Sequence, residues 1–193
     1  MKGLFEQTIG KIGSTINKNI SMEVMASYCK GDTLDIGCGK GNNNIKKYAR
    51  SVTGMDIEHF NPDYGEFIKE DFSKINTDKF RQKFDTIYSR EFIEHISDHK
   101  DFLDKCRIML KENGLLIFSS PTPMYWKTII GNTLFPKGKT SNKNHISVVV
   151  PRIINNLAEN CGFSIIDVKP QTRFNIPFFV YQMIYIYRKN YEN

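Results

Sequence analysis

The sequence predicts an α/β fold in which helices cover both faces of a doubly wound, mostly parallel sheet. Short runs rich in β-branched and aliphatic residues alternate with helical patterns, as expected for parallel strands joined by helical crossovers. The last two runs, FSIIDVKP (163–170) and FFVYQMIYIYRK (178–189), are close together and predict an antiparallel pair.

Turn and capping residues delimit the other elements. Five candidate strands precede the final pair, at 32–37, 51–57, 65–71, 84–89 and 114–120. Helices are predicted at 43–48, 91–96 and 100–111, the last followed by a stop at Asn113-Gly114. Another helix has Pro151 near its start and Gly162 just past its end. We expect residues 1–30 to cover the sheet or the cofactor, with a helix through Met22–Tyr28.

The composition indicates one globular domain over residues 1–193. The hydrophobic fraction of 40% and the charged fraction of 25% are typical of globular proteins. No apolar run approaches the roughly 20 residues that span a bilayer, and the first residues, MKGLFEQTIGKIG, lack the apolar core and cleavage site of a signal peptide. We therefore expect a cytoplasmic protein with no membrane span.

Neither the cysteines nor the net charge indicates a special site. The four cysteines are scattered without CxxC spacing, which favours reduced and mostly buried thiols over a zinc knuckle or a disulfide framework. The formal charge of +6 is spread along the chain, as is usual for solvated surface lysines. The densest basic cluster is PKGKTSNKNH (136–145).

A glycine loop follows the first predicted strand in LDIGCGKGN. Gly37, Gly39 and Gly41 stand where the backbone must turn tightly and pass close to a ligand, which favours residues without a Cβ. A dinucleotide fingerprint, GxGxxG, would place its third glycine at Asn42, whereas the spacing here is GxGxG. Asp35 precedes the loop and would be a poor neighbour for a pyrophosphate. The loop predicts a nucleotide-type site without naming the nucleotide.

Two further acids stand at the ends of the next two predicted strands. Asp56 can accept hydrogen bonds from both hydroxyls of a ribose, and Asp71 can accept one from an adenine amino group beside the Phe72 ring. Each acid alone is more often a surface or capping residue. Three acids in order at three consecutive strands indicate a nucleotide-type site more specifically than any one of them.

This series resembles the class I S-adenosylmethionine-dependent methyltransferases from Asp32 to about Arg188. The resemblance implies a Rossmann-like, three-layer sheet of seven strands with an antiparallel C-terminal hairpin. It also implies that the glycine loop holds the methionine part of the cofactor, the acid after the second strand its ribose, and the acid after the third strand its adenine. The implied cofactor-binding residues are Asp35, Gly37, Cys38, Gly39, Gly41, Asp56, Ile57, Asp71, Phe72 and Ser89.

The chain lacks the signatures of base methylation. Enzymes that methylate base amino groups usually carry Asn or Asp followed by two prolines after strand four, where this chain has SREF. Cytosine-carbon methylation needs a nucleophilic cysteine near a proline, and no cysteine here has that setting. Both classes of acceptor are therefore disfavoured.

The segment SREFIEHISD (89–98) predicts a metal site. On a helix, Glu91, Glu94 and His95 fall within an arc of about 100°, directly after the fourth strand. A plain solvent-exposed face is the alternative interpretation. Two facing carboxylates are unfavourable without a cation between them, and His145, after the fifth strand, is the candidate fourth ligand.

The pattern ExxEH with a distant His resembles the metal site of ubiquinone-pathway catechol O-methyltransferases and of small-RNA terminal 2′-O-methyltransferases. Bound Mn²⁺ or Mg²⁺ would lower the pKa of a hydroxyl and align its oxygen with the methyl group. Four protein ligands would leave two positions of an octahedral ion open, and the two oxygens of a vicinal diol could fill them. Glu91, His95 and His145 are the predicted catalytic residues, with either histidine able to take the proton.

The connection 121–145 is the predicted substrate lid. Aromatic side chains there favour stacking on sugars or bases, and lysines favour phosphate: Tyr125, Trp126, Phe135, Lys137, Lys139 and Lys143. An ordinary surface loop is the other interpretation. We expect a small-molecule or glycan acceptor, with or without a phosphate group. A sugar hydroxyl ranks first among the acceptors, a catechol-like metabolite second and an RNA ribose third.

Two other functional classes stay open at this point. A nicotinamide oxidoreductase would share the early strands but should show GxGxxG and bind NAD. A non-catalytic binding subunit would keep the fold without the activity, although Asp35, Asp56 and Asp71 are all present. The oligomeric state does not follow from the sequence.

Overall fold

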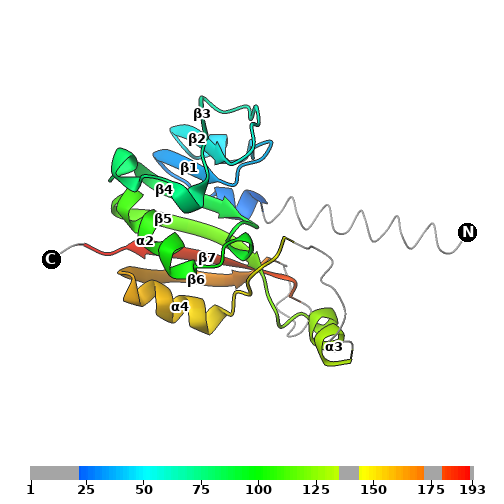
Figure 1. Cartoon of the computed structure of the whole chain (residues 1–193). Coiled ribbons are helices and arrows are strands. Elements are labelled where there is room, and N and C mark those ends of the chain that lie inside the picture. The colour runs from blue at the N-terminus through cyan, green and yellow to red at the C-terminus, as the bar shows by residue number, and fades with distance from the viewer. Residues whose placement is uncertain (1–21, 135–143, 172–179, 192–193) are drawn as a thin grey trace, which may run out of the picture.

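All seven predicted strands form one sheet in the computed structural model, which describes residues 22–134, 144–171 and 180–191 (Figure 1). The strands are β1 (Asp32–Ile36), β2 (Ser51–Asp56), β3 (Glu66–Lys69), β4 (Phe84–Arg90), β5 (Leu110–Pro121), β6 (Phe163–Pro170) and β7 (Gln182–Lys189). Their order in the sheet is β3-β2-β1-β4-β5-β7-β6.

The pairing of the strands confirms the predicted mixed sheet. Strands β1 to β5 pair in parallel, whereas β7 is antiparallel to both β5 and β6. Ile36 pairs with Met55 of β2 and with Ser89 of β4, so these three strands end at the same edge. The loops that follow β1, β2 and β4 therefore leave the sheet side by side.

Apolar clusters fill both faces of the sheet. On one face, α2 (His99–Met109) and α4 (Pro151–Asn160) cover a cluster that includes Phe102, Leu103 and Ile154. On the other face, Met25 and Ala26, from the helical residues 22–26, pack against the sheet. Of the helix predicted at 22–28, residues 22–26 are helical and 27–28 form a turn, and the fold has three layers.

Two predicted helices are shorter than the sequence suggested. The helix predicted at 43–48 is the 3-10 turn Ile45–Lys47. The helix predicted at 100–111 ends at Met109, and β5 already begins at Leu110. Phe84 pairs with Leu110 and Thr86 with Leu115, so the intervening residues, which include Asn113 at a φ of 59°, bulge out of the strand. The Asn113-Gly114 signal therefore marks a bulge, not a helix end.

The prediction of a helix at 91–96 is wrong. Only Ile93–His95 form a 3-10 turn, because Glu91 has a left-handed φ of 52° and Ile96 is extended. The predicted lid at 121–145 contains a helix that the sequence did not indicate, α3 (Trp126–Leu134). Phe135, Lys137, Lys139 and Lys143 lie outside the described residues.

No helix within the described ranges combines the length and the apolar character needed to cross a bilayer.

Candidate functional site

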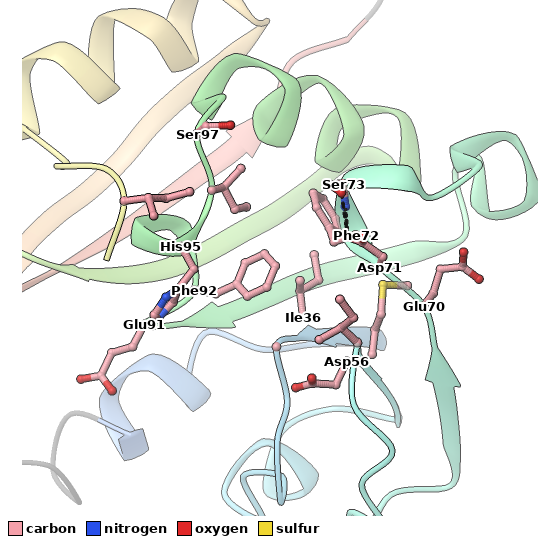
Figure 2. Close-up of a pocket in the computed structure, with 15 residues that line it drawn as sticks. Ile36, Asp56, Glu70, Asp71, Phe72, Ser73, Glu91, Phe92, His95 and Ser97 are labelled. Carbon is pink, nitrogen blue, oxygen red and sulfur yellow. Dashed lines mark hydrogen bonds between the residues drawn. The ribbon is translucent and has the colours of Figure 1, made fainter. Parts of the chain in front are cut away.

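A cavity of about 560 Å³ opens at the carboxyl ends of β1 to β4. Five of the predicted cofactor-binding residues line it: Gly37, Asp56, Ile57, Asp71 and Phe72. Glu91 and His95 line it too, at the end opposite to Glu70 and Asp71 (Figure 2). One cavity thus joins the glycine loop to the segment for which a metal site was predicted.

Asp56 organises the glycine loop as well as facing the cavity. Its Oδ2 accepts a hydrogen bond of 3.0 Å from the Gly39 N–H, and its Oδ1 accepts one of 3.2 Å from the Glu58 N–H. The Gly37 N–H donates to the Met55 carbonyl at 2.8 Å. The loop is therefore tied to the end of β2 on both sides of the turn.

Gly37 and Gly39 differ in the space around them, and we expect Gly37→Ala to lower the free energy of unfolding more than Gly39→Ala. Both glycines have left-handed φ, 66° and 50°, so either alanine pays about 1–2 kcal/mol of backbone strain. A Cβ on Gly37 would lie 2.6 Å from Phe92 Cδ2, whereas a Cβ on Gly39 meets nothing within 4 Å. The clash should add about 1–3 kcal/mol in urea unfolding. Equal losses would contradict the tight contact with Phe92.

Asp35 is buried beneath the loop and does not line the cavity. It is 3% exposed and accepts a 2.6 Å hydrogen bond from the Tyr64 hydroxyl. Burial raises the pKa of Asp35 to about 7, and the bond from Tyr64 opposes that rise. The same hydroxyl accepts a hydrogen bond from the Asn42 N–H. Tyr64 thus joins the first strand to the end of the glycine loop, a role that no spacing in the sequence indicated.

Four other predicted cofactor-binding residues lie outside the cavity lining: Cys38, Gly39, Gly41 and Ser89. Ser89 is 1% exposed, and its hydroxyl has no hydrogen-bond partner within the described part of the chain. A Cβ on Gly41 would lie 3.1 Å from Tyr64 Cζ.

Asp71 caps a turn at the far end of the cavity. It accepts hydrogen bonds from the Ser73 N–H at 2.9 Å and from the Ser73 hydroxyl at 2.7 Å, and these bonds lower its pKa. Phe72 packs edge-on against Phe92, with ring centroids 5.8 Å apart. Phe92 was not predicted as a site residue, yet its ring lies between Gly37 and the predicted adenine end.

Three of the four predicted metal ligands converge. Glu94, His95 and His145 each offer a ligand atom, and these atoms lie within 4.8 Å of one another. Glu91 is not in this group, and its Oε1 accepts a 3.1 Å hydrogen bond from Gln182. The prediction that Glu91 lies beside Glu94 and His95 assumed an α-helix. The backbone of Glu91 is instead left-handed, and this residue lies outside the short 3-10 turn that contains Glu94 and His95.

Backbone hydrogen bonds bring His145 to the 3-10 turn. The N–H groups of Ile146 and Ser147 donate to the Glu94 carbonyl at 3.0 and 3.2 Å. The Ser147 hydroxyl donates to the Ile93 carbonyl at 3.3 Å. The His145 ring consequently meets the His95 ring edge-on, with centroids 4.9 Å apart.

The local environment of the group suits a cation. Glu94 is 2% exposed, and neither carboxylate oxygen has a hydrogen-bond partner among the described residues. Burial raises the pKa of Glu94 to about 7, and the Glu91 charge adds to that rise. A buried carboxylate without a partner is costly unless a cation neutralises it.

Both histidines can present a neutral ring nitrogen. His95 Nδ1 lies 2.8 Å from the Asn144 carbonyl oxygen. Because a carbonyl only accepts, Nδ1 carries the proton and a neutral ring leaves Nε2 free, as in many metal-binding histidines. Burial lowers the pKa of His145, and the nearby His95 lowers it further. These features favour metal-ligating forms.

The sequence matches the family model described as "Methyltransferase domain" over residues 22–168. A solved structure described as a putative methyltransferase, from Bacillus halodurans, superposes with a TM-score of 0.68 at 14% identity and covers 90% of this chain and 100% of that chain. At this identity the superposition establishes likeness of fold.

Curated relatives share parts of the sequence. A protein of Histophilus somni named ubiquinone biosynthesis O-methyltransferase is 32% identical over 103 residues, which cover 45% of this chain and 43% of the relative. A protein of the same name from Coxiella burnetii is 27% identical over 154 residues, which cover 70% of this chain and 64% of the relative. The matched segments thus cover less than half of one relative and less than two thirds of the other.

Proposed function

Because the chain belongs to the methyltransferase domain family and has the fold of S-adenosylmethionine-dependent methyltransferases, we propose that it methylates a hydroxyl oxygen of an acceptor with two adjacent hydroxyls. The observation that carries the proposal is that the cavity and the Glu94 group share His95 at the carboxyl edge of the sheet. The name O-methyltransferase, borne by relatives, supports oxygen as the methylated atom.

The residues of the cavity fit S-adenosylmethionine. The cofactor supplies a methyl group on a positively charged sulfur, which leaves as a neutral thioether. We assign its methionine part to the loop at Gly37, its ribose to Asp56 and Ile57, and its adenine to Asp71 and Phe72. A volume of about 560 Å³ is typical of small-molecule sites, and Gly37 leaves no room for a side chain.

Glu94, His95 and His145 would hold a divalent cation such as Mn²⁺ or Mg²⁺. The unpartnered, buried carboxylate and the two imidazoles form a mixed oxygen and nitrogen donor set. When bound there, the ion would lower the pKa of an acceptor hydroxyl. Because both histidines are then ligands, Glu91 is the residue left to accept the proton of that hydroxyl.

The acceptor would lie beside an aromatic pair at the same edge. The rings of Tyr125 and Tyr181 meet edge-on with centroids 5.6 Å apart. Burial raises the pKa of Tyr181, and the charges of Glu91 and Glu94 add to the rise, so this ring lies near both carboxylates. We rank a catechol-type acceptor above the sugar hydroxyl that the sequence favoured, because relatives are named for ubiquinone biosynthesis.

We expect methyl transfer to a catechol in the presence of Mn²⁺, and we expect EDTA to abolish it. A panel of catechols, sugars and RNA 3′ ends, with tritiated S-adenosylmethionine, measures both dependences. Methyl transfer to sugars but not to catechols would identify a sugar as the acceptor and leave the proposed metal-assisted O-methylation unchanged. Full activity in EDTA would contradict the metal, and stabilisation by NAD instead of S-adenosylhomocysteine would contradict the whole assignment.

A further inference from the structure

The buried side-chain amide of Gln182 contacts Glu91. Gln182 begins β7, pairs with Pro121 at the end of β5 and is 3% exposed. Its Nε2 donates one 3.1 Å hydrogen bond to Glu91 Oε1 and another to Ser119 Oγ, also at 3.1 Å. Both amide hydrogens are thus engaged, and one of them binds a carboxylate that lines the cavity.

The backbone of Glu91 is constrained together with its side chain. Its φ of 52° is a left-handed conformation, which is unfavourable for a residue with a Cβ. Its N–H donates to the Ser119 carbonyl at 3.2 Å. Such a conformation persists only where the surroundings impose it, and residues of this kind cluster at functional sites. Ser119 therefore holds Glu91 through the backbone, and Gln182 holds it through the carboxylate.

We infer that Gln182 is a positioning residue for methyl transfer, which fixes Glu91 so that its other oxygen, Oε2, faces the acceptor hydroxyl. The inference rests on the proposed function. In the reaction, the acceptor O–H bond breaks as the new O–CH₃ bond forms, the proton passes to Glu91, and the electrons of the broken S–CH₃ bond stay on sulfur. Gln182 exchanges no proton and acts only through the orientation of Glu91.

This arrangement also separates the two carboxylates of the segment. Glu94 is one of the three candidate metal ligands, together with His95 and His145, whereas Glu91 is not. The charge of Glu91 is nevertheless close enough to raise the pKa of Glu94. A donor on β7 gives Glu91 a partner other than the cation. Glu91 consequently remains available to the acceptor.

A double-mutant cycle tests the inference in the full chain with Mn²⁺ and S-adenosylmethionine. Gln182→Met removes both donors at similar length and should lower kcat/KM on the order of 10- to 100-fold, the factor that corresponds to a hydrogen bond to a charged group. Affinities for S-adenosylhomocysteine and Mn²⁺ should not change. In a Glu91→Ala background, which keeps the strained backbone, Gln182→Met should have no further effect.

Ser119→Ala provides the matched control. It removes the second partner of the Gln182 amide and leaves the Glu91 contact, so its loss of kcat/KM should be smaller. A Gln182→Met enzyme with wild-type kcat/KM, or one whose loss persists in the Glu91→Ala background, would overturn the role of Gln182. A wild-type protein that methylates no acceptor would instead overturn the proposed function. The Gln182 side-chain amide signals in ¹⁵N NMR spectra should shift in Glu91→Ala, and unchanged signals would also overturn the role.

Discussion

Glu94→Gln is expected to remove Mn²⁺ binding and to lower methyl transfer to the level seen in EDTA. Glu94 is the single carboxylate in the three-residue group, and a neutral amide is a much weaker ligand for a divalent cation. The loss of Mn²⁺ affinity should exceed the roughly 10- to 100-fold change that follows removal of a group that only supports a ligand. Titration calorimetry with MnCl₂ measures this loss.

The same substitution should not destabilise the metal-free protein. The pKa of Glu94 rises from 4.5 to about 7 on burial, so the folded chain binds more protons than the unfolded chain between these values. The metal-free protein consequently loses stability as the pH rises through that window. Glu94→Gln removes the contribution of Glu94, whereas that of Asp35, whose pKa is also raised to about 7, remains. In EDTA at pH 8, urea unfolding should show a variant at least as stable as the wild type.

Glu91→Gln is the matched control, since it makes the same chemical change three positions earlier. Because Glu91 lies outside the ligand group, this variant should keep its Mn²⁺ affinity and lose turnover. Equal losses of Mn²⁺ affinity in both variants would place Glu91 among the ligands, as the sequence pattern had predicted.

Asp56→Ala is expected to weaken S-adenosylhomocysteine binding on the order of 100-fold. The carboxylate is assigned to the ribose hydroxyls, and it also accepts the N–H groups of Gly39 and Glu58. Hydrogen bonds to a charged group are worth about 1.5–3 kcal/mol each, so the loss of the loop anchor adds to the loss of the ligand contact. Calorimetry or the ligand-induced shift in melting temperature measures the change.

Glu58→Ala provides the comparison for Asp56. The Glu58 side chain is exposed, and the residue contacts Asp56 through its backbone N–H, which the substitution keeps. Its affinity for S-adenosylhomocysteine should equal that of the wild type. An Asp56→Ala protein with unchanged affinity would refute the ribose assignment.

Much of the fold could be predicted because it depends on local patterns. Seven apolar runs became seven strands, and the closeness of the last two correctly indicated an antiparallel pair. The family match over residues 22–168 confirms the resemblance that LDIGCGKGN and the strand-end acids suggested. The errors fell where local signals are ambiguous, as at Asn113-Gly114, because a left-handed residue can end a helix or form a bulge.

The sequence by itself determined the order of strands along the chain, the glycine loop and the identity of the candidate ligands. Only the tertiary structure decided which of those ligands meet. Glu94, His95 and His145 converge because Ile146 and Ser147 donate to the Glu94 carbonyl, a contact between segments about 50 residues apart that no periodicity encodes. Glu91 lies outside this group, and its Oε1 accepts a hydrogen bond from Gln182, whose place in the sheet depends on β7 pairing antiparallel to β5.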